Sequence, residues 1–167
     1  MYNIHLITKF KITSNLNLSN ITELNQIEIN KKNIDEIKLL YQNQTVKIKE
    51  IFNVKIFKNN KTENEILIQG SNEYFDYLGY LWEKNILITD SDVGSYVGAR
   101  MKGGKLVLAG SAGDYLGSEM EKGSIEVKKN VGDYLASAFE GGKVGMRGGD
   151  IIINGNVGKF SCSFMRR

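Results

Sequence analysis

The sequence predicts a mainly β fold: a right-handed parallel β-helix, a single-stranded solenoid of about five coils, preceded by a small N-terminal α+β appendage. Three observations predict it: a motif that recurs every 19 residues, short apolar strands within each repeat, and glycines confined to the repeating part. All 18 glycines lie at or beyond Gly70, whereas 12 of the 17 asparagines lie at or before Asn64. This change in composition divides the chain into an appendage over 1–64 and a glycine-rich repeat domain over 65–167.

The pattern of apolar residues in the N-terminal part predicts short strands around one helix. Ile4 and Leu6 alternate with polar residues, and so do the apolar residues of 10–12, 27–29 and 46–56; a period of two rich in β-branched residues favours strands. Asn33 is the expected N-cap of a helix over 34–40, because apolar residues recur there at three-residue spacing.

The repeat is clearest in the segments 94–98, 113–117, 132–136 and 158–162, with Tyr77-Leu78-Gly79 as a fainter fifth copy. The first three begin 19 residues apart, and the fourth follows after 26, which is an insertion of 7. Apolar triplets recur at 66–68, 86–88, 106–108, 125–127 and 151–153. Stacking such repeats at a strand spacing of about 4.8 Å places equivalent side chains in columns. We therefore expect Tyr96, Tyr115 and Tyr134 to form one stack.

The recurring glycines are interpreted as structural corners. A phosphate loop or a dinucleotide fingerprint would occur once, and neither motif is present, whereas the spacing G-x-x-x-G recurs from repeat to repeat. Glycine reaches the positive φ values that sharp corners require. The structural repeat glycines are Gly79, Gly94, Gly98, Gly113, Gly117, Gly132 and Gly158.

The inventory of reactive residues argues against a catalytic, cofactor or metal site in this chain. Cys162 and His5 are the only cysteine and histidine, which excludes an intrachain disulfide and a Cys or His zinc site. Cys162 replaces small residues of earlier repeats and is expected to be a buried thiol, and His5 is expected on the surface of a strand. The acidic residues of the repeats are interpreted as solvated turn acids: Asp90, Asp92, Asp114, Glu119, Glu121 and Asp133.

Charge and hydropathy limit the partners and the location. There are 22 Lys and Arg against 19 Asp and Glu, a formal charge of +3 without a run of like charges, so nucleic acid is not a predicted partner. The start of the chain does not resemble a secretory signal peptide, and no apolar stretch is long enough to span a membrane. Membrane insertion is not expected, and a cytoplasmic location is.

The insertion, residues 137–147, is either a tolerated loop or a docking loop, because insertions in repeat proteins project from one face. The last repeat ends with apolar residues followed only by Arg166 and Arg167, which are too few to cover an apolar end. We expect this end or the insertion to be buried against a larger subunit, and the isolated chain to self-associate. The candidate partner contacts are Phe139, Lys143, Met146, Arg147, Phe164 and Met165.

The repeats at 92–104 and 112–120 resemble the glycine-rich β-helix domain shared by the large subunit of glutamate synthase and the β-helical subunit of formylmethanofuran dehydrogenase. Three segments resemble the formylmethanofuran dehydrogenase subunit in particular: Asn33-Ile34-Asp35-Glu36-Ile37-Lys38, residues 46–54, and Gly145-Met146-Arg147-Gly148-Gly149-Asp150 after the insertion. The resemblance covers about residues 33–167.

The resemblance implies a non-catalytic structural subunit of an archaeal, cytoplasmic formylmethanofuran dehydrogenase, the oxidoreductase complex that reduces carbon dioxide and attaches it as a formyl group to methanofuran in methanogenesis. It implies oxidoreductase and amidohydrolase-like partner subunits, which carry a tungsten or molybdenum bis-pterin, iron–sulfur clusters and zinc. It implies no cofactor in this chain, which alone is expected to be inactive. Two alternatives stay open: a glutamate-synthase-type domain of an amidotransferase, and the corresponding β-helical subunit of a formyltransferase/hydrolase complex.

Overall fold

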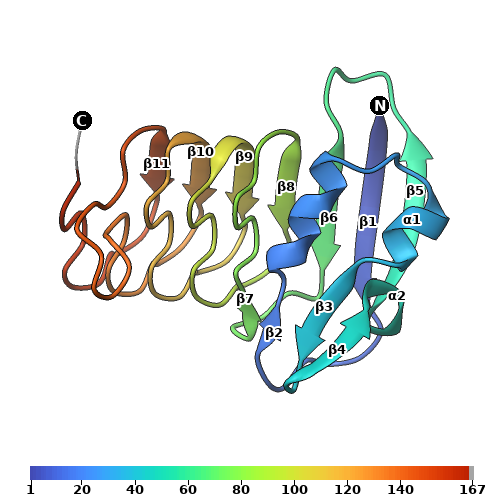
Figure 1. Ribbon diagram of the computed structural model, residues 1–167, viewed down its shortest axis with the longest axis horizontal. Helices are drawn as coiled ribbons and strands as arrows, with labels where there is room; N and C mark the ends of the chain where they lie inside the picture. The colour runs from blue at the N-terminus through green and yellow to red at the C-terminus, as the bar shows by residue number, and fades with distance from the viewer. Residues whose placement is uncertain (166–167) are drawn as a thin grey trace.

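The computed structural model describes residues 1–165, which form an α/β fold built on two mixed sheets and a few short helices (Figure 1). The larger sheet has the strand order β11-β10-β9-β8-β6-β1-β5, and the smaller sheet the order β4-β3-β2-β7. The larger sheet consists of β1 (Tyr2–Thr8), β5 (Phe52–Lys58), β6 (Glu65–Gln69), β8 (Ile86–Thr89), β9 (Lys102–Leu108), β10 (Lys122–Val127) and β11 (Asp150–Ile153). The smaller consists of β2 (Leu16–Asn17), β3 (Lys38–Tyr41), β4 (Gln44–Lys47) and β7 (Phe75–Asp76). The helices are the 3-10 helix η1 (Ser19–Asn25), α1 (Lys31–Asp35) and α2 (Ile48–Ile51).

The five apolar triplets of the repeats are strands, as predicted, and they are parallel neighbours in the larger sheet. One apolar residue of each strand aligns with its equivalent in the next strand, in the series Ile66, Leu87, Leu106, Ile125 and Ile151. Figure 1 shows β8 to β11 side by side, with their connecting segments folded into successive loops on one side. Equivalent residues therefore recur at the strand spacing.

The predicted fold class, a right-handed parallel β-helix, is wrong, because the larger sheet is mixed and continues into the N-terminal part. β1 pairs in parallel with β6 and antiparallel with β5. Ile4 and Leu6 of β1 are fully buried and align with Ile66 and Ile68 of β6. Apolar alternation in β1 thus allows it to cover the edge of β6, which would otherwise expose unpaired backbone groups. The repeats therefore extend an α/β fold with mixed sheets.

The helix predicted over 34–40 lies elsewhere. α1 begins earlier because Asn30 is its N-cap: the Asn30 side chain accepts a hydrogen bond from the backbone N–H of Asn33 at 2.9 Å. Residues 38–41 form β3, in which Leu39 is buried and Leu40 is exposed. Pairing of β3 with both β2 and β4 overrides the three-residue spacing on which the prediction rested. Residues 27–29, predicted as a strand, lie outside the strands.

The repeat glycines meet two different structural needs. Gly79, Gly98 and Gly117 have φ values of 71°, 65° and 62°, as the corner interpretation requires. The glycines at 94, 113, 132 and 158 have no positive φ but lack room for a side chain: a Cβ on Gly132 would lie 2.2 Å from Asp114 Oδ1. These four positions are small because the preceding repeat fills the space.

Candidate functional site

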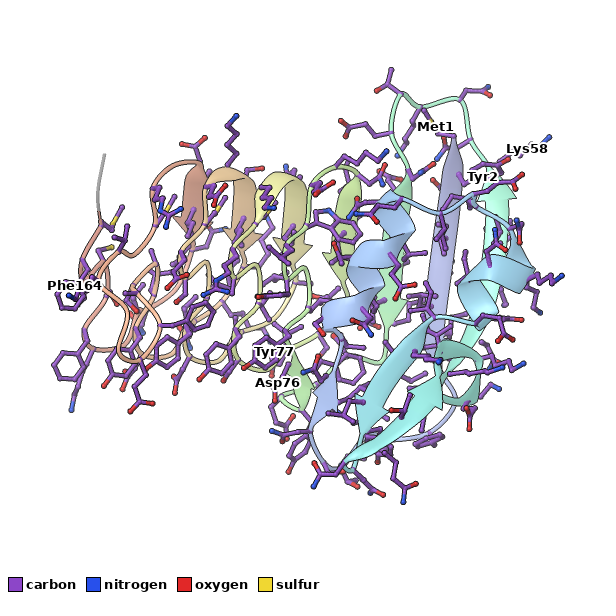
Figure 2. The ribbon with its side chains drawn as sticks, in the orientation of Figure 1. Met1, Tyr2, Lys58, Asp76, Tyr77 and Phe164 are labelled. Atoms are coloured by element: carbon purple, nitrogen blue, oxygen red, sulfur yellow. The ribbon has the colours of Figure 1, made fainter. Side chains whose placement is uncertain are left out.

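An aromatic column runs along one face of the repeats. Neighbouring ring centroids lie 4.7–5.3 Å apart with interplanar angles of 6–15°. Figure 2 labels Tyr77, its first member, which follows β7 in the chain, and Phe164, which lies at the far end of the molecule. The predicted stack of Tyr96, Tyr115 and Tyr134 is confirmed. The column consists of Tyr77, Tyr96, Tyr115, Tyr134 and Phe160.

Hydrogen bonds between repeats hold each ring of the column in place. The residue before each ring accepts the backbone N–H of its equivalent in the next repeat. Asp76 Oδ1 accepts from Ser95 N at 2.8 Å, and Asp114 Oδ1 accepts from Asp133 N at 2.7 Å. Asp133 Oδ1 accepts from Lys159 N at 2.7 Å. The predicted turn role of Asp114 and Asp133 is therefore wrong, because each carboxylate accepts from the next repeat and not from its own turn.

The column raises the pKa of several of its own groups. Burial raises the pKa of the Tyr96 phenol above 10.0, and the neighbouring Tyr77 and Tyr115 and the carboxylate of Glu140 raise it further. Burial likewise raises the pKa of Tyr115, with smaller effects of Tyr134 and Glu140. These phenols stay protonated at neutral pH and serve as hydrogen-bonding groups along the face.

The insertion folds back against this column. The Phe139 ring lies beside it, nearly parallel to Tyr96 at 5.7 Å and to Tyr115 at 6.4 Å. The guanidinium of Arg100 lies over the Phe139 ring, 4.9 Å from its centroid. Arg100 Nε donates to Glu119 at 2.8 Å, which fixes the cation above the ring.

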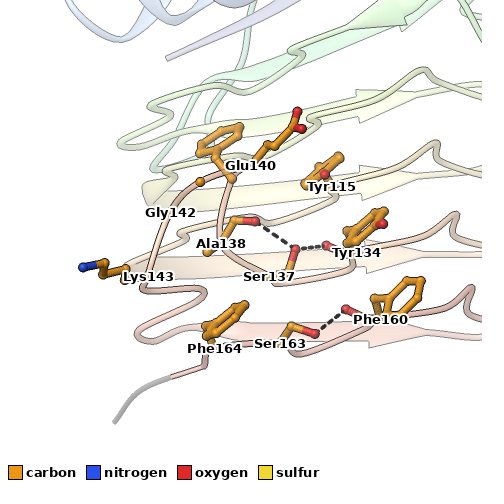
Figure 3. A pocket seen from close by; sticks show the side chains of 12 residues that line it. Tyr115, Tyr134, Ser137, Ala138, Glu140, Gly142, Lys143, Phe160, Ser163 and Phe164 are labelled. Atoms are coloured by element: carbon orange, nitrogen blue, oxygen red, sulfur yellow. Dashed lines mark hydrogen bonds between the residues drawn. The ribbon is translucent and has the colours of Figure 1, made fainter.

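A pocket of about 680 Å³ lies between the insertion and the aromatic column (Figure 3). In Figure 3, Ala138 and Phe164 face Tyr134 and Phe160 across it. The hydroxyls of Ser137 and Ser163 donate to the carbonyls of Tyr134 and Phe160, at 2.7 and 2.9 Å, so their protons are already engaged. The pocket is lined by Tyr115, Tyr134, Ser137, Ala138, Phe139, Glu140, Gly141, Gly142, Lys143, Phe160, Ser163 and Phe164.

The structure brings only some of the predicted partner contacts together. Phe139, Lys143 and Phe164 line the pocket. Met146 is a core side chain, Arg147 pairs with Glu121 at 3.2 Å, and Met165 is exposed in the last described repeat. Arg166 and Arg167 lie outside the described residues.

Sequence reasoning missed Arg100 and Ala138, although a signal was present. Both lie four residues after a ring of the column, where the repeats carry Leu81, Arg100, Glu119, Ala138 and Phe164. Alignment of the repeats at this position would have shown one small residue in a line of longer ones.

The other candidate groups lie apart from the pocket. His5 is half-buried in β1, where its ring contacts Phe57 edge-on at 5.2 Å. Cys162 is exposed, which corrects the expected buried thiol, because its repeat contributes the outermost strand, β11. Within residues 1–165 no three His, Cys, Asp or Glu side chains are grouped to hold a metal ion. Asp90 accepts hydrogen bonds from the backbone of Gly70 and Ser71.

Comparison with known proteins shows a likeness to a solved structure. No protein-family model matches the sequence, and no curated protein does. Among solved structures, the chain is similar to one in the crystal structure of the formyltransferase/hydrolase complex from Methylorubrum extorquens in complex with methylofuran. The TM-score is 0.85 at 23% identity, over 98% of this chain. The likeness shows the fold. This chain spans 60% of the length of that chain.

This likeness corrects the predicted enzyme class. The similar structure is a formyltransferase/hydrolase complex and not a dehydrogenase, which contradicts the prediction of an oxidoreductase subunit. Among the described residues, no helix is long and apolar enough to cross a membrane.

Proposed function

We propose that this chain is a non-catalytic structural subunit of a formyltransferase/hydrolase complex that handles formyl groups carried on a methanofuran-like compound. The observation that carries the proposal is the shared fold, which extends over 98% of this chain. Fold alone does not determine function, so the proposal depends on the assembly in which the chain is found.

The reactive residues support a structural role. His5 is in β1 and Cys162 follows β11, and these strands are separated by β6, β8, β9 and β10 in the sheet. A Cys–His dyad requires the two side chains within hydrogen-bond reach, which this separation prevents. We assign catalysis and its cofactors to the partner subunits.

We assign the contact with those subunits to the edge strand β11. The other edge strand, β5, carries Lys55 and Lys58, and charges of this kind discourage edge pairing. β11 instead presents Ile152, which is 59% exposed, and the segment that follows it exposes the rings of Phe160 and Phe164. Exposed apolar residues at an edge are typical of an interface.

Affinity purification of the tagged chain from its own cells tests the proposal. The expected result is co-purification of formyltransferase and hydrolase subunits, reduced by Ile152→Lys. Phe57→Lys is the matched control, because Phe57 lies on the other edge strand and is 50% exposed. Recovery of glutamine amidotransferase and flavin-binding subunits would instead favour the glutamate-synthase alternative, and recovery of the chain alone would contradict a structural role.

A further inference from the structure

A second position recurs four residues after each ring of the aromatic column, and one repeat leaves a gap there by carrying a short side chain. Four residues after each ring the repeats carry Leu81, Arg100, Glu119, Ala138 and Phe164. Ala138 contributes only a methyl group and lies near the start of the insertion. The pocket lies at this gap, with Ala138 and Phe164 among its lining residues.

The ring of Phe139 closes one side of the gap. Its plane is within 19° and 15° of the planes of Tyr96 and Tyr115, so it lies parallel to the rings of the column. Arg100 covers one face of this ring and lines a separate hollow with Tyr77 and Tyr80. The other face is therefore turned toward Tyr134, into the pocket.

Phe164 closes the opposite side. It belongs to the same repeat as Phe160, and Figure 3 shows it across the pocket from that ring, one repeat beyond Ala138. The Phe164 side chain is 66% exposed, so its ring is not enclosed by other residues. Two aromatic rings thus bound the space above the Ala138 methyl.

We propose that this pocket binds a small planar aromatic molecule between Phe139 and Phe164, over Ala138 and beside Tyr134. A ring in this position would continue the parallel arrangement of the column, in which successive rings are about 4.8 Å apart. The volume of the pocket is within the range that small ligands occupy, roughly 300–1,000 Å³.

The polar groups of the pocket favour a ligand chosen by its flat shape more than by its charge. Glu140 and Lys143 lie at its mouth, are both exposed, and carry opposite charges. The phenols of Tyr115 and Tyr134 can exchange hydrogen bonds with a substituent on the ring. An uncharged ring with one hydroxyl group therefore matches the site.

Titration of the full chain with 2-naphthol, compared with decahydro-2-naphthol, tests the proposal. The two probes carry the same hydroxyl group, and only 2-naphthol is flat and aromatic. We expect saturable calorimetric binding of 2-naphthol, at least about tenfold tighter than that of the decahydro compound. Alanine-methyl NMR should show an upfield ring-current shift at Ala138 and none at Ala99 or Ala112, which are buried elsewhere.

Variants separate this site from non-specific binding. Phe164→Ala removes one exposed ring and should weaken 2-naphthol binding about fivefold. Ala138→Leu should abolish binding by filling the gap, and Phe57→Ala should change nothing. Equal affinity for both probes, a shift at the control alanines, or unchanged binding by Phe164→Ala would each overturn the proposal. Subunit co-purification is a separate readout, since the site does not depend on the proposed function.

Discussion

At the scale of single residues, the repeats are joined by side chains that accept backbone hydrogen bonds from the following repeat. Asp76, Ser95, Asp114 and Asp133 each accept a backbone N–H from the following repeat. A glycine precedes each of the last three acceptors and allows the preceding repeat to approach closely. In these repeats, an acidic or hydroxyl residue after a glycine therefore accepts a hydrogen bond from the next repeat, a contact that the neighbouring sequence does not reveal.

The acceptor function predicts a difference between two substitutions of Asp114. Asp114→Asn keeps an oxygen for the N–H of Asp133, and Asn130 already accepts from Asn156 N at 2.9 Å in another such contact. Asp114→Ala removes the acceptor and should lower the free energy of unfolding by about 0.5–1.5 kcal/mol. Urea unfolding measures both, and an equal loss in the two variants would contradict the acceptor role.

Asp76 gives a prediction about pH. Burial raises the pKa of its carboxyl above the usual 3.8, so the folded chain holds this proton more tightly than the unfolded chain does. The contribution of Asp76 to stability is therefore present below pH 3.8 and is lost as pH rises through the folded pKa.

Asp76→Asn should consequently unfold at higher urea than the natural chain at pH 7, and the two midpoints should converge below about pH 4. Asp150→Asn is the control, because it removes the same charge from an exposed position. A gain that is equal for both variants, or independent of pH, would show that net charge is responsible.

At the scale of elements, the aromatic column is the most regular feature of the repeats. Each ring is held at a positive φ, as in Tyr96 at 60° and Tyr115 at 60°, a conformation that costs energy in a bulky residue. The stacking of each ring on its neighbours offsets that cost. The column thus depends on contacts between repeats that no single repeat can form.

Tyr115 tests this dependence, because it stacks on both Tyr96 and Tyr134. Tyr115→Phe keeps the ring and should change the free energy of unfolding by less than about 1 kcal/mol, as Phe160 at the end of the column indicates. Tyr115→Ala removes two stacking contacts of a partly buried ring and should cost about 1–3 kcal/mol. Thermal unfolding followed by near-UV circular dichroism measures both, and a small cost for alanine would show that the column is not needed for stability.

Periodicity predicted the repeated elements and the strand around Ile4 and Leu6, and it failed for the helix, which occurs once. The strand triplets and the tyrosine stack were predictable because each was supported by several equivalent copies. The single helix was misplaced because Leu39 and Leu40 fit helical spacing and strand alternation equally well. The pocket was not predicted, because Ala138 becomes a lining residue only when the fold places Phe139 and Phe164 around it.

At the scale of the whole molecule, β1 connects the two parts of the chain. It is the central link between β5 and β6, and its Ile4 and Leu6 are fully buried. The composition change near residue 64 predicts two domains, whereas a continuous sheet allows the free energy of either part to depend on the other. Whether the two parts unfold together or separately decides between these two descriptions.

Two intrinsic signals report on the repeats. Trp82, the only tryptophan, is fully buried, and its Nε1 donates to the Asn85 carbonyl at 3.2 Å. The stacked tyrosines give a near-UV circular dichroism signal from the neighbouring repeats. Ile4→Ala removes buried methyl groups from β1, which carries neither signal, and should cost about 2–5 kcal/mol.

If the sheet unfolds as one unit, Ile4→Ala shifts the urea midpoints of Trp82 fluorescence and tyrosine dichroism by the same amount. Leu106→Ala in β9 should shift the same two midpoints together, since Leu106 is fully buried within the repeats. The opposite outcome is a tyrosine signal that keeps its natural midpoint in Ile4→Ala while Leu106→Ala lowers it. That result would show that the repeats fold independently of β1, and it would place a true domain boundary near residue 64 despite the shared sheet.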